Sequence, residues 1–464
     1  MGKTSVRTVA TRLFGLAVFV APAAVLSADL LSVWQAAQTH DPAYRVAKTD
    51  QRAGLARLEQ AKALARPTVS LTGAVGLTSL YGSTQGAQFY SSQMGSGPYE
   101  KAEFNTSIYL GATAKTALVA VQPLFDKSLQ AASRQLDLSA QVADLAAEVS
   151  RQFLALSVVE RFLDVLEAQE MVRLVSQQIG ALEAAHAQLE KRLRLGDISR
   201  LDVEESLERI AQLRAERIAR ESQLVTANRL LADLAGGVQV LARPGLQIQK
   251  LEGLLRKPLD ELVSDLKTTH PLLKSVDLRR QMSLLEVQKY ARGQDGVRVQ
   301  AVGSVGLEGA TGYGDYGHAS QRSASQFVGV QVVVPLSTGG YRSAKAQELA
   351  VEADRLVEER AQRALELEQA ARNAHFSAQS GQARLELIAS RLATAKKRLT
   401  DTDKAYQQGA RSTLEWLAAK SSVYEVEGQL FMERLSIARQ VARRQAQAGQ
   451  LLDLEIAQLD QYLR

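Results

Sequence analysis

The chain has 464 residues, of which 46% are apolar and 23% are charged, a composition typical of an ordered protein rather than a disordered one. Its formal net charge of +6 is too small to indicate nucleic-acid binding. Because the chain contains no cysteine, disulfides, thiolate metal sites, a cysteine nucleophile and a lipid-anchor cysteine are excluded.

Residues 1–28 have the pattern of a secretory signal peptide. A positively charged start with Lys3, Arg7 and Arg12 precedes an apolar stretch at 13–20, and small residues suitable for cleavage end at Ala28. No later apolar run is long enough to form a transmembrane helix. We therefore expect the chain to leave the cytoplasm, and either to be soluble in an oxidising space or to enter a membrane as a β-barrel.

The remainder of the chain contains one pattern twice. The segment Val75-Gly76-Leu77 recurs as Val305-Gly306-Leu307, 230 residues later, and Pro123-Leu124 recurs as Pro335-Leu336, 212 residues later. The difference between the offsets places 18 additional residues in one loop of the first copy. The sequence therefore predicts a first repeat at 29–235, an inter-repeat segment at 236–262 that packs at the equator of the molecule, and a second repeat at 263–464 that ends in the same region.

Each repeat is predicted to contain a helical region, two strands and a long helical hairpin. The first helical regions cover 29–65 and 258–292. Apolar and polar residues then alternate, as in strands with one apolar face. The predicted strands are 68–78, 104–121, 297–307 and 326–335, each with about 10 regular residues, the length of a tilted membrane strand. Segments rich in Gly, Ser, Tyr and Gln, at 81–101 and 308–324, are predicted to be loops that face outward.

The helical hairpins are predicted to be unusually long. Proline is absent between Leu124 and Arg243 and again from Leu336 to the last residue. A helix of about 70 residues would extend roughly 105 Å. Alanine at heptad spacing in this region is typical of close coiled-coil packing.

Four strands with one apolar face cannot close a barrel alone, and an open edge in a bilayer leaves backbone groups unsatisfied. Several copies of the chain could close one. The signal peptide, the duplicated strand pairs and the long helices together predict a tube that crosses an outer membrane and reaches into the periplasm.

Two turn motifs, 195–203 (LGDISRLDV) and 408–416 (QGARSTLEW), carry a resemblance to a known family. Together with the duplication, they resemble the TolC-type outer-membrane factors over essentially all of 29–464. The resemblance implies a mainly α protein with a membrane β-barrel, closed as a homotrimer with twelve strands and an α-helical tunnel. It also implies partners: a periplasmic membrane-fusion adaptor, an inner-membrane ABC transporter and, in type I secretion, an exported protein toxin such as cyclolysin.

The same resemblance implies the positions of a gate at the periplasmic tips. The implied residues are the tip-turn glycines Gly196 and Gly409, the gate residues Asp202, Tyr406 and Arg411, and the pore-constricting acid Glu415. Family members often carry a second acid three residues after the constricting one. Ala418 occupies that position here, so a single ring of carboxylates is expected.

We expect no enzyme activity and no cofactor. The five histidines do not have metal-ligand spacing, although His40 and His270 occupy equivalent repeat positions that suggest helix capping or packing. A G-x-G-x-x-G pattern at 312–317 fits a loop tip better than a nucleotide site. Two alternatives to toxin secretion stay open: an outer-membrane component of a small-molecule efflux pump, and a pore-less periplasmic coiled-coil scaffold. No role is predicted for residues beyond about 450.

Overall fold

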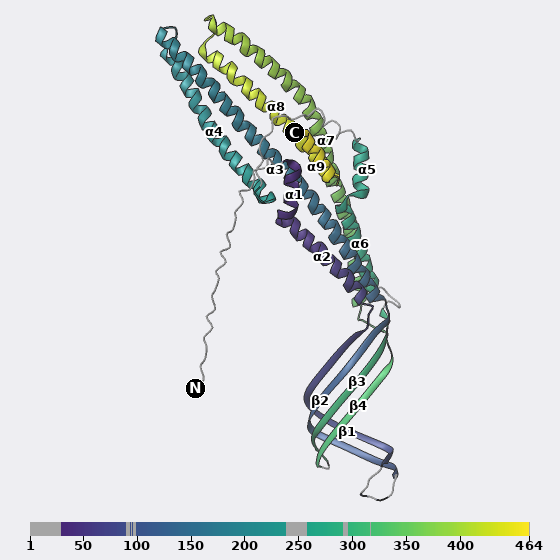
Figure 1. Ribbon diagram of the computed structural model, residues 1–464. Helices are drawn as coiled ribbons and strands as arrows, with labels where there is room; N and C mark the ends of the chain where they lie inside the picture. Colours follow the sequence, from purple (N-terminus) through teal and green to yellow (C-terminus); the bar gives the residue numbers. More distant parts are fainter. Residues whose placement is uncertain are drawn as a thin grey trace, which may run out of the picture.

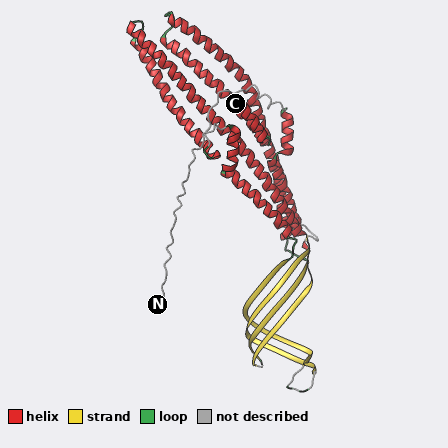
Figure 2. Cartoon of the chain, viewed as in Figure 1, coloured by secondary structure: helices red, strands yellow, loops and turns green. Residues whose placement is uncertain are grey.

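The structure, a computed structural model, describes residues 29–89, 93, 95, 99–237, 258–290, 296–315 and 317–463. The predicted signal peptide and most of the inter-repeat segment, at 238–257, lie outside these ranges. The described residues form an elongated molecule with helices at one end and a sheet at the other (Figure 1; Figure 2).

The elements follow the order expected from the duplication. They are α1 (Leu30–His40), α2 (Pro42–Ala63), β1 (Thr68–Phe89), β2 (Tyr99–Asp126), α3 (Lys127–Leu195), α4 (Arg200–Ala235), α5 (Leu259–Thr269), α6 (Pro271–Tyr290), β3 (Arg298–Gly314), β4 (Gly317–Val333), α7 (Tyr341–Gln407), α8 (Thr413–Gln447) and α9 (Asp453–Leu463). The predicted fold class, mainly α with four antiparallel strands, is confirmed.

The long helices are confirmed. Helix α3 has 69 residues and α7 has 67, so each extends about 100 Å at 1.5 Å per residue. The Asp126 side chain starts α3, because its Oδ1 accepts hydrogen bonds from the backbone N–H groups of Ser128 and Leu129. The helices of each hairpin, α3 with α4 and α7 with α8, run side by side to tips that lie farthest from the sheet (Figure 1).

The four strands form one antiparallel sheet in the order β1-β2-β3-β4. Strand β2 from the first repeat pairs with β3 from the second, with Leu118 opposite Val305. The two repeats therefore share one sheet, and β1 and β4 are its edges.

The strands are longer than predicted, and the two predicted loops are wrong. Most of 81–101 continues β1 to Phe89 and begins β2 at Tyr99, and most of 308–324 belongs to β3 and β4. In these segments polar residues occur on both faces of the strands, so the sequence shows no alternation of apolar and polar residues. The hydrogen-bonded pairing of the strands continues there regardless of side-chain type. The 18 additional residues of the first repeat lengthen the β1–β2 hairpin, which continues past the β3–β4 turn; we call 80–89 and 99–109 the β1–β2 extension.

The main core lies midway along the helices, where α1, α3, α4, α8 and α9 meet. The Trp34 indole Nε1 donates to Asp453 Oδ1 at 2.7 Å, and the backbone N–H of Leu30 donates to Asp460 Oδ1 at 2.9 Å. Ile456 and Leu459 of α9 are fully buried there. The residues beyond 450, to which the sequence assigned no role, therefore complete the core.

The capping role suggested for His270 is confirmed. Its Nδ1 accepts a hydrogen bond from the backbone N–H of Leu272 at 3.1 Å, so the side chain caps the first turn of α6. Its repeat equivalent His40 is exposed at the end of α1, where the Asp41 side chain caps α2 instead.

Candidate functional site

The two helical tips have the same local design. Gly196 and Gly409 end α3 and α7 with φ of +80° and +75°, a backbone conformation that favours glycine. At the first tip the N–H of Asp197 donates to the Arg192 carbonyl at 3.0 Å; at the second the N–H of Ala410 donates to the Ala405 carbonyl at 2.8 Å. Both predicted tip turns are thus tight glycine-capped helix ends.

The two predicted acids first serve as helix caps. The Ser199 backbone N–H donates to Asp202 Oδ2 at 3.1 Å, and the Ser412 N–H donates to Glu415 Oε2 at 3.0 Å; each serine hydroxyl accepts from the backbone N–H of its acid. These are capping boxes, and the Ser-x-x-Asp/Glu spacing could have identified them from sequence.

Both acids are held in the charged form. Hydrogen bonds from the Ser199 side chain, and further ones from the Ser199 backbone and the Thr413 side chain, lower the pKa of Asp202. The Ser412 backbone N–H and then the Arg411 guanidinium lower the pKa of Glu415. Both carboxylates are therefore charged at neutral pH.

Tyr406 lies in a column of stacked side chains that sequence reasoning did not find. Its ring is parallel to Trp416, with centroids 4.7 Å apart, and the Arg192 guanidinium lies 4.9 Å from the Tyr406 centroid. The Lys420 Nζ lies 4.8 Å from the Trp416 ring centroid. Because α3, α7 and α8 each contribute, the column joins the two hairpins close to their tips.

The structure brings only some of the predicted gate residues together within one chain. Arg411 pairs with Glu415, four residues later in the same tip, and not with Asp202. The Tyr406 hydroxyl is buried and has no hydrogen-bond partner among the described residues. Asp202 faces Ser199, Thr413 and Arg192.

The two faces of the sheet differ in polarity. Val69, Ala120, Gly303 and Val328 are partners in one row across the four strands, and their face is apolar. Its exposed large side chains include Val69, Leu71, Val75, Leu77, Leu118, Val305, Leu307, Val328, Val330 and Val332. On β4 this face is interrupted by Gln326 and Arg322.

The opposite face is polar. Ala74, Lys115, Glu308 and Ser323 form a row on it, and Lys115 Nζ lies 2.6 Å from Glu308 Oε1 on the neighbouring strand. A single sheet thus exposes an apolar surface on one side and a solvated surface on the other.

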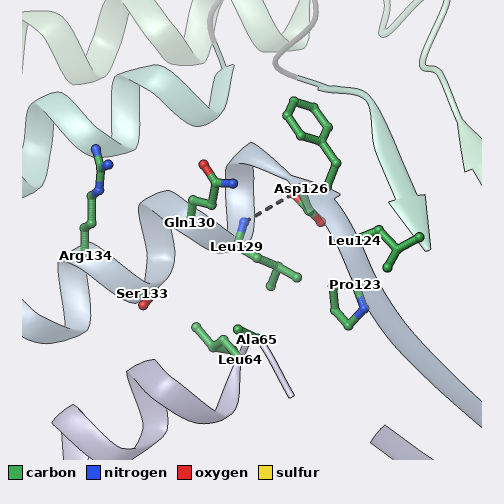
Figure 3. A pocket seen from close by; sticks show the side chains of 10 residues that line it. Leu64, Ala65, Pro123, Leu124, Asp126, Leu129, Gln130, Ser133 and Arg134 are labelled. Atoms are coloured by element: carbon green, nitrogen blue, oxygen red, sulfur yellow. Dashed lines mark hydrogen bonds between the residues drawn. The ribbon is translucent and has the colours of Figure 1, made fainter. Parts of the chain in front are cut away.

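A crevice of about 300 Å³ lies where the sheet meets the helices. Figure 3 shows its lining from the end of α2, the end of β2 and the first turns of α3, with Asp126 bonded to the N–H of Leu129. The side chains around it are Leu64, Ala65, Pro123, Leu124, Phe125, Asp126, Leu129, Gln130, Ser133 and Arg134. Its one carboxylate serves as a helix cap, so the crevice marks a structural junction.

Within the described ranges no group of three or more His, Cys, Asp or Glu side chains could hold a metal ion. Among these same residues no helix is both long and apolar enough to cross a membrane.

No known family model matches this chain, and no curated protein matches it. Solved structures do match along almost the whole chain. A membrane protein from Pseudomonas aeruginosa has a TM-score of 0.71 at 15% identity and covers 92% of this chain and 93% of its own. The outer membrane protein VceC from Vibrio cholerae has a TM-score of 0.66 at 16% identity, covering 91% and 97%.

The CmeC outer membrane channel of Campylobacter jejuni has a TM-score of 0.67 at 11% identity, covering 94% of this chain and 90% of its own. At these identities the likeness establishes the fold. The chain therefore has the fold of the TolC-type outer-membrane channels, as the turn motifs indicated.

Proposed function

We propose that this chain is one subunit of a homotrimeric channel that lies in the outer membrane and extends into the periplasm. The observation that carries the proposal is the sheet, which exposes one apolar face and has two open edges. An open edge is costly in lipid, and closure with further copies of the same sheet removes it. Three chains supply twelve strands, with the apolar face toward lipid and the polar face toward the lumen.

The helices support the same assembly. Several large apolar side chains on α4 and α7 are exposed in the single chain, as expected of surfaces that a neighbouring subunit covers. They are Leu201, Leu207, Ile218 and Val225 on α4, and Val351, Val357, Leu365 and Leu387 on α7. A pore-less scaffold would use the helices in a similar way but would not need the apolar sheet face.

As to cargo, we favour a type I secretion substrate, a protein toxin such as cyclolysin. This rests on overall sequence resemblance to the outer-membrane component of the Bordetella cyclolysin apparatus, CyaE, and on the lack of a lipid-anchor cysteine. The expected partners are a periplasmic adaptor and an inner-membrane ABC transporter. Small-molecule efflux is the second candidate, because outer membrane channels such as CmeC share the fold and a fold alone does not select the cargo. Deleting the gene and identifying which molecule stops leaving the cell separates the two.

The tips are proposed to form the periplasmic gate. Since Arg411 is exposed and does not contact Asp202 within one chain, this pair would form between subunits. The Tyr406 hydroxyl is buried within its own chain and would reach a neighbouring subunit only after the tip rearranges. An exposed ion pair contributes about 0.2–1 kcal/mol, so three symmetric copies would favour the closed state by roughly 1–3 kcal/mol. A docking partner that binds the open state better can overcome a bias of that size.

The channel proposal is tested by reconstitution. The purified protein should migrate as a heat-sensitive trimer and form ion-conducting pores in planar bilayers. An arginine on the lipid face costs about 2–4 kcal/mol at the bilayer midplane, so Val75→Arg should reduce the amount of assembled trimer in membranes. Thr72→Arg, on the polar face of the same strand, is the matched control and should assemble normally. A stable monomer without pore activity would contradict the proposal.

A further inference from the structure

The β1–β2 extension does not continue straight along the sheet. In Figure 1 the parts of β1 and β2 that lie beyond the β3–β4 turn bend across the end of the sheet that is away from the helices. The turn begins at a register shift between Thr78 and Leu80, where the β1–β2 pairing becomes irregular. Bulges of this kind bend strands and change the direction in which they continue.

The extension bends toward the polar face of the sheet. Gly312 and Gly314 lie four and six residues after Glu308 on β3, so all three share one face of the strand. A side chain at either glycine would therefore project from the polar face. A Cβ at Gly314 would clash with the Ser107 carbonyl oxygen, and one at Gly312 would lie 2.8 Å from Ile108 Cγ2. Atoms of the extension therefore occupy the space that side chains would otherwise fill.

Side chains at this end of the sheet are buried on the polar face and exposed on the apolar face, in agreement with a bend toward the polar face. Ile108 is 0% exposed and Ala310, on the polar face beside it, is 6% exposed, in a sheet whose side chains are otherwise mostly accessible. Thr311 and Tyr313, on the opposite face, are exposed. One hydrogen bond fixes the arrangement, because the backbone N–H of Asp315 in the β3–β4 turn donates to Ser107 Oγ at 2.8 Å.

We propose that the β1–β2 extension forms a second constriction, at the outer mouth of the channel, held over the lumen by Ile108 and Ser107 against the glycines of β3. This rests on the proposed function, which makes the polar face the lumen wall and the end away from the helices the outer mouth. Three extensions per trimer turn toward the axis and restrict the exit independently of the helical tips. A polypeptide substrate passes only when the extensions swing outward.

Thiol labelling tests the position of the extension directly, since the chain has no cysteine of its own. Ala310→Cys lies under the extension and should resist a small charged methanethiosulfonate reagent. Ser323→Cys, exposed on the same polar face, is the control and should react rapidly. Equal reaction of both cysteines in the assembled trimer would overturn the proposal.

Conductance tests the constriction itself. Gly314→Val should displace the extension, raise single-channel conductance and, when combined with Ala310→Cys, make the introduced thiol reactive. Gly309→Val on the same strand should change neither, because a Cβ there meets no atom within 4 Å. If Gly314→Val does not fold, replacing 80–109 with Asn-Gly removes the extension, shortens the hairpin to the level of the β3–β4 turn and should give the same two changes. Unchanged conductance in a shortened, functional pore overturns this inference alone, whereas a wild-type protein that forms no pore overturns the proposed function.

Discussion

Tyr406 and Arg411 are the residues through which the proposed gate can be tested. Tyr406→Phe combined with Arg411→Ser removes one buried hydroxyl that has no partner within the described chain and one guanidinium. If both groups bond to a neighbouring subunit, the double variant should raise single-channel conductance in bilayers. Glu415→Ala should separately weaken cation selectivity and block by multivalent cations, because the carboxylate is charged at neutral pH.

The matched control for the gate variant is Tyr424→Phe with Arg391→Ser. These substitutions make the same chemical changes on α8 and α7 but farther from the tips, where Arg391 Nη1 donates to Gln429 at 2.8 Å. The conductance of this control should equal that of the wild type. If the gate variant also conducts like the wild type, the assignment of these residues to a gate is wrong.

His270 should make stability depend on pH. Burial lowers its pKa from 6.5 to about 4 in the folded chain. As pH falls below 6.5 the unfolded chain binds a proton that the folded chain does not, so stability falls until about pH 4 and then levels, by a total of roughly 3 kcal/mol per chain at most. His270→Asn keeps a capping acceptor without the titration, so the slope of melting temperature against pH should flatten.

The exposed His40 provides the comparison for this experiment, since it occupies the equivalent position in the first repeat. His40→Asn makes the same chemical change at an exposed position and shows what the substitution does by itself. A slope that is equally steep in the wild type and in His270→Asn would exclude His270 as its source.

At the scale of elements, two glycines of the first hairpin should respond in opposite directions to the same substitution. Gly196→Ala forces a side chain into a left-handed conformation at the end of α3 and should lower stability by about 1 kcal/mol. Gly180→Ala lies inside α3, where a Cβ meets no atom within 4 Å, and should raise stability by about 0.5–1 kcal/mol. Urea unfolding of both variants checks the prediction, which fails if the two effects have the same sign.

Element type could be predicted wherever a periodic signal extends along the whole element. The scarcity of proline and glycine predicted α3 and α7, and alternation predicted the part of each strand nearest the helices. The alternation of apolar and polar residues ends at Leu77, because Gly82, Ser83 and Thr84 continue β1 with small or polar residues on both faces. The predicted helical stretch 29–65 is two helices, since Asp41 caps a new helix that begins at Pro42.

The site was predictable only where a local motif carried it. The resemblance of the two turn motifs points to the turn glycines and the two acids, and the Ser-x-x-Asp/Glu spacing accounts for the capping bonds of these acids. The column of Arg192, Tyr406, Trp416 and Lys420 does not, because three helices must first pack before these rings and cations meet. The same holds for Ile108, whose position over Gly312 depends on a bend that no sequence pattern indicated.

At the scale of the whole molecule, one chain exposes two different kinds of surface. Its exposed large apolar side chains gather on one face of the sheet, interrupted on β4 by Gln326 and Arg322, whereas the helices expose mainly charged side chains arranged in ion pairs one turn apart. Duplication explains how a single chain supplies both kinds of surface twice, and the pairing of β2 with β3 fuses the two copies into one sheet.

The contact between the first and last helices has a consequence for how the protein is made. Leu30 bonds to Asp460 across 430 residues, and Trp34 bonds to Asp453 across 419. Contacts of such sequence separation form slowly, and these cannot form before synthesis has reached the last helix. The helical hairpins can assemble early from local contacts, but the core in which α1 and α9 meet forms last. A partly synthesised chain therefore cannot complete this core until the residues of α9 have been made.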